Sequence, residues 1–137
     1  MSTPTETSVV KPVNDVPVAT VNTVTAVEDV PLVIDATDFI FTDVESDALV
    51  SVTITGLTLN GGSLTHSGGT DVIDGDTLIL AELADLTFTS ALNDSTDSSF
   101  TYTVNDADAG VTPAIMTITV NAVPVATDNT VATDENV

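Results

Sequence analysis

The chain has 137 residues, of which 42% are hydrophobic, so it is long and apolar enough to fold around a core. Its 21 acidic residues stand against one base, Lys11, and the net charge of −20 excludes binding to nucleic acid or to an anionic membrane surface. With no Cys, no Arg and one His, the composition also argues against catalysis, and we expect no enzymatic activity.

The N-terminal residues 1–15, which begin with a stretch rich in Ser, Thr and Pro, are predicted to form a linker. They lack the basic and apolar stretches of a cleavable signal, and no run of 18 apolar residues predicts insertion into a membrane.

An internal repeat sets the domain boundaries. Residues 13–30 and 120–137 are identical at 12 of 18 positions, with an offset of 107 residues. We therefore predict one module over residues 16–122 and the incomplete start of the next over residues 123–137. The partners of this module are then the neighbouring repeats of a tandem array, and the module itself is expected to be monomeric.

Period-two alternation of apolar and polar residues predicts strands along the whole module, most clearly in residues 50–55, VSVTIT. The predicted strands cover residues 18–26, 32–41, 50–55, 62–66, 77–80, 86–89, 100–104 and 116–120, with one helical turn at 81–85. One buried and one solvated face per strand favours antiparallel sheets. The predicted fold is an all-β, seven- to eight-stranded antiparallel Greek-key β-sandwich of the immunoglobulin-like or cadherin-like kind.

Acidic residues fall in the loops of one end of this sandwich. The segment 43–47 (DVESD) lies between the second and third strands, and 105–110 (NDADAG) lies between the last two. In an extended chain alternate side chains point the same way, so Asp43, Glu45 and Asp47 are expected to converge. Acids also collect in solvated loops without any ligand, but here their mutual repulsion calls for an offsetting cation.

Calcium is the favoured ion, because it takes six to eight oxygen ligands, whereas transition metals prefer His or Cys and only His66 is present. We read His66 as a surface residue. A second, weaker site is predicted at the opposite end of the module. The predicted metal ligands are Asn14, Asp15, Asp43, Glu45, Asp47, Asp106 and Asp108 at the first end, and Glu28 and Asn121 at the second.

Four motifs together resemble the cadherin-like repeats of giant bacterial RTX adhesins. They are residues 13–19 (VNDVPVA), 28–32 (EDVPL), 41–47 (FTDVESD) and 100–106 (FTYTVND). The resemblance implies a secreted or cell-surface module that extends a ligand-binding tip away from a Gram-negative outer membrane after type I secretion, with Ca²⁺ stiffening the linkers.

The same resemblance implies roles for single residues. Asn14 and Asp15 of the entering linker, Asp43 and Glu45 of the first acidic loop and Asp106 of the second would bind the ion, and Glu28 would act at the outgoing end. In the second copy of the linker motif Ala122 stands where the first has Asp15. This change implies that the outgoing junction binds calcium more weakly, or bends.

Two functions remain open from the sequence: a structural extender, or a ligand-binding module for a glycan, a protein or a surface. A glycan site would show exposed aromatic residues, which are scarce at 4%. Threonine rows such as Thr101, Thr103, Thr117 and Thr119 could contact a surface, but β-propensity on a solvated face also explains them. A pocket or an exposed aromatic patch would favour the binding role.

Overall fold

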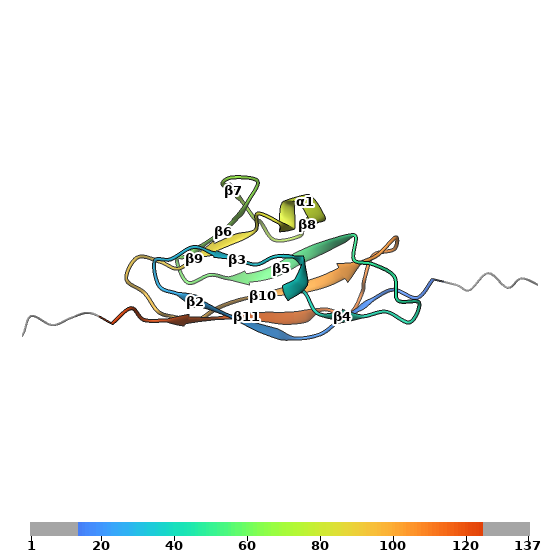
Figure 1. The fold of residues 1–137 in the computed structure, drawn as a ribbon, viewed down its shortest axis with the longest axis horizontal. Coiled ribbons are helices and arrows are strands. Elements are labelled where there is room, and N and C mark those ends of the chain that lie inside the picture. Colours follow the sequence, from blue (N-terminus) through green and yellow to red (C-terminus); the bar gives the residue numbers. More distant parts are fainter. Residues whose placement is uncertain (1–13, 125–137) are drawn as a thin grey trace, which may run out of the picture.

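The computed structural model describes residues 14–124, which form two packed β-sheets in an elongated body (Figure 1). Residues 14 and 124 lie at opposite ends of its long axis. The strands are β1 (Val18–Ala19), β2 (Asn22–Val27), β3 (Leu32–Val33), β4 (Phe41–Thr42), β5 (Ser51–Thr58), β6 (Ser63–His66), β7 (Thr70–Asp71), β8 (Asp76–Ile79), β9 (Thr87–Thr89), β10 (Ser98–Asn105) and β11 (Ala114–Asn121); the helices are η1 (Ala36–Asp38) and α1 (Leu80–Leu83). A chain that enters at one end and leaves at the other suits an end-to-end array.

The larger sheet has five strands in the order β2-β11-β10-β5-β8. Its neighbours run antiparallel, as predicted, except that β2 and β11 run parallel, with Asn22 opposite Met116 and Val27 opposite Asn121. Period-two alternation indicates which face of a strand is buried but not the direction of its partner, so this parallel pair could not be predicted from it.

The smaller sheet has four strands in the order β3-β9-β6-β7, and β1 and β4 form a separate two-stranded ladder. All eight predicted strands contain strand residues, and the predicted helical turn is present as α1. The strand β7, which lies between the predicted strands 62–66 and 77–80, was not predicted. The predicted all-β sandwich is thus confirmed.

The first two predicted strands are each interrupted. Residues 32–41 do not form one strand, because η1 separates β3 from β4. Two side chains cap this short helix: Asp35 accepts a hydrogen bond from the amide of Thr37 (3.0 Å), and Asp38 accepts one from the amide of Asp35 (3.1 Å). Such local capping competes with hydrogen bonding to a neighbouring strand, and here a short helix forms although the sequence pattern predicts a strand.

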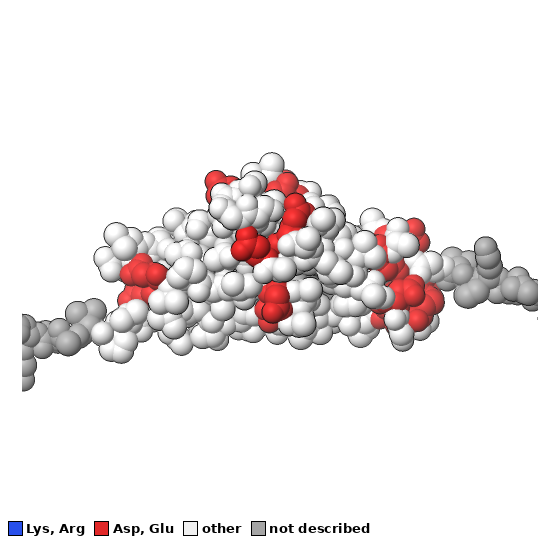
Figure 2. Space-filling view, turned by 45° about the horizontal axis from the view of Figure 1, so that its top comes forward, with Lys and Arg blue, Asp and Glu red and all other residues white. Residues whose placement is uncertain are grey.

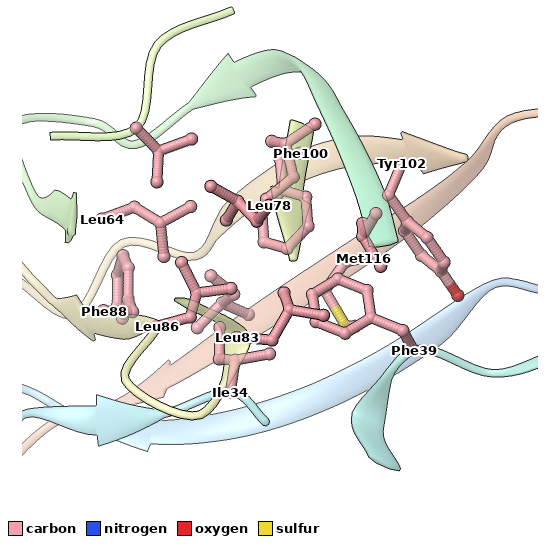
Figure 3. Packing of buried hydrophobic residues seen from close by; sticks show 14 of the residues in the cluster. Ile34, Phe39, Leu64, Leu78, Leu83, Leu86, Phe88, Phe100, Tyr102 and Met116 are labelled. Atoms are coloured by element: carbon pink, nitrogen blue, oxygen red, sulfur yellow. The ribbon is translucent and has the colours of Figure 1, made fainter. Parts of the chain in front are cut away.

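The core between the sheets is aliphatic with a small aromatic group at one end (Figure 3). Phe39, from the turn after η1, packs edge-on against Tyr102 with ring centroids 5.1 Å apart, and its centroid is 6.1 Å from that of Phe100. Phe88 is fully buried elsewhere in the core. The predicted core of Val, Ile and Leu around a few aromatics is therefore present, and burial of these side chains is the main stabilising term.

The hydroxyl of Tyr102 ties the core to the first strands. It donates to the backbone carbonyl oxygen of Thr20, with that of Ile40 also 3.1 Å away, and the amide of Thr20 in turn donates to the Ile40 oxygen (2.8 Å). Figure 3 shows this oxygen pointing out of the core toward the first strand segment. Burial raises the pKa of Tyr102, so the group is a neutral donor in any ordinary medium.

Replacing Tyr102 with Phe should lower the free energy of unfolding by about 1–2 kcal/mol, because the ring stays packed while the carbonyl groups lose their donor. Urea denaturation of the wild-type and variant chains measures the change. Thr103→Val is the matched control, since it removes a hydroxyl from the neighbouring outward position of the same strand, and it should stay within about 0.5 kcal/mol. Equal losses in both variants would show that the Tyr102 hydroxyl has no special role.

Candidate metal centre

Three acidic segments meet at the end of the sandwich where the chain enters: the connector at residues 14–15, the β4–β5 loop at 43–47 and the β10–β11 loop at 106–108. Figure 2 shows acidic side chains gathered at both ends of the body and around β7 and α1. Residues 14–124 contain no Lys or Arg, so within them no basic side chain other than His66 is available to offset these charges.

The β4–β5 loop wraps around the side chain of Asp43. Its Oδ1 accepts hydrogen bonds from the amides of Glu45 (2.8 Å) and Asp47 (3.0 Å), and Ser46 has a positive φ of 61°. One carboxylate oxygen from each of Asp43, Glu45 and Asp47 lies within 4.8 Å of the others. The three carboxylates therefore converge, as predicted. The prediction that an extended segment brings them together was wrong, because the loop forms a tight turn around Asp43.

The β10–β11 loop folds back on itself in a similar way. Oδ1 of Asp106 accepts the amide of Asp108 (2.7 Å), and the Asp106 amide donates to the backbone oxygen of Asp108 (3.2 Å). The side chain of Asn14 reaches across and donates to Oδ2 of Asp106 (3.0 Å) and Oδ2 of Asp108 (2.9 Å). The connector is thereby attached to a loop 92 residues further along the chain.

The connector is attached to the β4–β5 loop as well, because the amide of Asp15 donates to Oε1 of Glu45 (3.0 Å). At the centre, Oδ2 of Asp43 is buried and has no hydrogen-bond partner in the structure. A buried carboxylate oxygen without a partner is costly, and it is the feature expected where a cation completes the site. The oxygen-only donor set around it fits a hard divalent ion such as Ca²⁺.

The pKa values show how crowded these acids are. For Glu45 the hydrogen bond from the Asp15 amide lowers the pKa, but burial and the charges of Asp15 and Asp43 outweigh it, so the pKa is raised. For Asp106 the hydrogen bond from the amide of Asp108 is the largest influence and lowers the pKa, and the hydrogen bond from Asn14 lowers it further. Asp106 is therefore held ionised, while Glu45 bears the repulsion that a cation would relieve.

One residue that positions this site was missed from the sequence. Asn105, the last residue of β10, is buried and donates to the hydroxyls of Ser51 (3.0 Å) and Thr53 (3.1 Å), while its Oδ1 accepts the amide of Gly110 (2.9 Å). It thus ties both ends of the loop that carries Asp106 to β5. An Asn at the end of a strand, directly before an acidic turn, is the signal by which it could have been found.

The two residues predicted for the second site lie at the opposite end of the body. The amide of Glu28 donates to the backbone oxygen of Asn121 (2.9 Å), and Oε1 of Glu28 accepts the amide of Val123 (2.8 Å). Glu28 is buried and Asn121 is exposed. Metal binding at this end stays a prediction, as does most of the incomplete next repeat, which lies outside the described residues.

The interpretation of His66 as a surface residue was wrong. It lies at the end of β6 and is 9% exposed, with Nδ1 2.9 Å from the Ser67 hydroxyl and 3.6 Å from Oε2 of Glu82. Because side chains alternate along a strand, His66 lies on the same buried side of β6 as Leu64, opposite to Thr65.

A pocket or an exposed aromatic patch would favour a ligand-binding module. Residues 14–124 contain no pocket and no helix long and apolar enough to cross a membrane. The aromatic residues of this range are buried, apart from the half-buried Phe41. The predicted threonine rows are half-buried and face away from the core, since they alternate with the buried residues of β10 and β11.

Comparison with known proteins gives one family. A model of the bacterial Ig domain matches residues 14–119, which include both acidic loops and the connector residues Asn14 and Asp15. No curated protein and no solved structure matches the chain. The match spans most of the chain and agrees with the two-sheet architecture described above, so the chain belongs to the bacterial Ig domain family.

Proposed function

We propose that this chain is a structural extender module of a large repeat adhesin, and that Ca²⁺ bound where modules join stiffens the array. Bacterial Ig-like domains commonly occur in extracellular or surface proteins. The four motifs that resemble repeats of RTX adhesins support a secreted parent protein, exported by type I secretion and held at the bacterial surface. The internal repeat supports a tandem arrangement.

The observation that carries the calcium proposal is the buried, unpartnered Oδ2 of Asp43, in a loop where the carboxylates of Asp43, Glu45 and Asp47 converge. Asp43, Glu45 and Asp47 offer oxygens from one loop, and Asp106 and Asp108 from another. Asn14 now donates its NH₂ to two acids, and the same amide carries an oxygen that can serve as a ligand. These groups supply the several oxygen ligands that Ca²⁺ needs.

A cation held there would stiffen the junction for a simple geometric reason. The connector enters between two loops that are themselves fixed to the ends of β4, β5, β10 and β11. Ligands drawn from the connector and from both loops would fix the direction in which the preceding module leaves. Removing the ion would leave repelling carboxylates at the same place, so the joint would loosen.

Small-angle X-ray scattering on a two-module chain tests this proposal. Residues 1–124 followed directly by residues 18–137 give such a chain, with the native connector between the modules. We expect a longer, narrower distribution of distances in calcium than in chelator. Magnesium at the same concentration is the control, because it keeps most of its water and needs fewer protein ligands. Identical profiles in calcium and chelator would contradict calcium stiffening.

A further inference from the structure

The connector between modules occurs twice in this chain, once at each end of the sandwich. It reads Asn14-Asp15-Val16-Pro17 at the entrance and Asn121-Ala122-Val123-Pro124 at the exit. The first copy shows the contacts that a connector makes with the module that follows it. The second copy shows the contacts that a connector makes with the module that precedes it. Taken together, the two copies describe a complete junction.

The following module holds the first two residues of the connector. The Asn14 side chain donates to Asp106 (3.0 Å) and Asp108 (2.9 Å), and the backbone amide of Asp15 donates to Glu45 (3.0 Å). The second contact uses only a backbone N–H. Ala122, which replaces Asp15 in the other copy, supplies the same donor.

The preceding module holds the first and third residues. The parallel ladder of β2 and β11 ends at Val27 and Asn121, and Glu28 continues it by donating its amide to the Asn121 oxygen (2.9 Å). The Glu28 carboxylate then accepts the amide of Val123 (2.8 Å). Glu28 is only 9% exposed, so this charge-assisted bond is shielded from water.

These two sets of contacts use different groups of the connector, so they do not compete for the same donors or acceptors. The following module takes the Asn side chain and the second N–H, and the preceding module takes the Asn carbonyl and the third N–H. The fourth residue is Pro, which has no N–H to satisfy. In a tandem pair every backbone N–H of the three residues after the Asn is thus accounted for.

We propose that the Asn-x-Val-Pro connector is a hydrogen-bonded joint shared by two consecutive modules, and that Glu28 of the preceding module is the residue that positions it. The inference rests on the tandem arrangement of the proposed function, but it assigns Glu28 a role that needs no metal. Its partner is the next module of the same array. Only residues 122–124 separate β11 from the residue that corresponds to the start of β1, so the two modules abut.

Two variants of Glu28 distinguish a role as hydrogen-bond acceptor from a role as metal ligand or as buried charge. Gln keeps the oxygen that accepts from Val123 and loses the charge, whereas Ala loses both. In chelator, Glu28→Ala in the full chain should speed amide hydrogen exchange of Val123 by about tenfold or more, while Glu28→Gln should stay within about threefold of the wild type. Exchange at Val52, buried in β5, reports whether the variants remain folded.

The two-module chain then tests the joint itself. With Glu28 of the first module replaced by Ala, residual dipolar couplings in chelator should show the two modules losing their common orientation, and Gln should restore it. Exchange and orientation unchanged in Glu28→Ala, or Gln as damaging as Ala, would overturn the proposal. If the Ala variant unfolds, Glu28→Met takes its place, because Met fills a similar volume without an oxygen that can accept from the Val123 amide. A calcium-independent scattering profile would refute calcium stiffening alone.

Discussion

Replacing Asp43 and Asp106 together with Asn should abolish the rise in melting temperature that calcium gives the wild-type chain. A ligand at a hundred times its dissociation constant stabilises a folded protein by about 2.7 kcal/mol, which for a domain of this size corresponds to a shift of about 10 °C. Asp43 carries the unpartnered buried oxygen, and Asp106 is the buried acid of the facing loop. Without their charges the remaining acids hold the cation poorly.

Melting curves in chelator and in calcium measure this effect, and the chelator curves give a second expectation. In chelator the variant should be somewhat less stable than wild type, because Asn at position 106 gives up the charge-assisted hydrogen bonds from the Asp108 amide and from Asn14 that lower the pKa of Asp106. Asp71→Asn with Asp74→Asn is the matched control: it removes two charges from exposed positions in or near β7. The control should keep the full calcium response, and loss of the response in both variants would indicate a general charge effect.

The sequence predicted the fold well because one physical pattern governs it. In β10 every second residue is buried, from Ser98 through Phe100 and Tyr102 to Val104, and the same alternation runs through the other long strands. The alternation does not determine which strands pair or in which direction they run. The parallel pairing of β2 with β11 was therefore missed. The break between β3 and β4 was missed for another reason, since it depends on the side-chain caps from Asp35 and Asp38.

For the candidate site, the sequence predicted which segments would meet but not how. The strand order places the two acidic loops and the entering chain at one end of the sandwich. The proximity of Asn14 to Asp106 could therefore be expected from the sequence. The turn around Asp43 could not be predicted in this way, because it depends on the Asp43 carboxylate accepting hydrogen bonds from the amides of Glu45 and Asp47. The contact of Glu28 with Val123 likewise depends on three-dimensional register, which a local pattern does not contain.

Gly110→Ala should cost about 3 kcal/mol of stability and weaken the calcium response, although it removes no acidic group. A Cβ at this position would lie 2.1 Å from the carbonyl oxygen of Val104. Val104 cannot move away, because it is fully buried and is paired with Val52 in the middle of the larger sheet. The loop must therefore shift instead, and the bond from the Gly110 amide to Asn105 is lost with it.

Such a shift reaches the candidate metal centre directly, since Asn105 is followed by Asp106 and Asp108 in the same loop. Urea denaturation with and without calcium measures both effects in one series. Val111→Ala is the control: Val111 is the next residue and is 73% exposed, so trimming it should change stability by less than about 0.5 kcal/mol and leave the calcium response intact. A Gly110→Ala chain that is destabilised but responds to calcium as the wild type does would mean that the position of this loop does not govern the site.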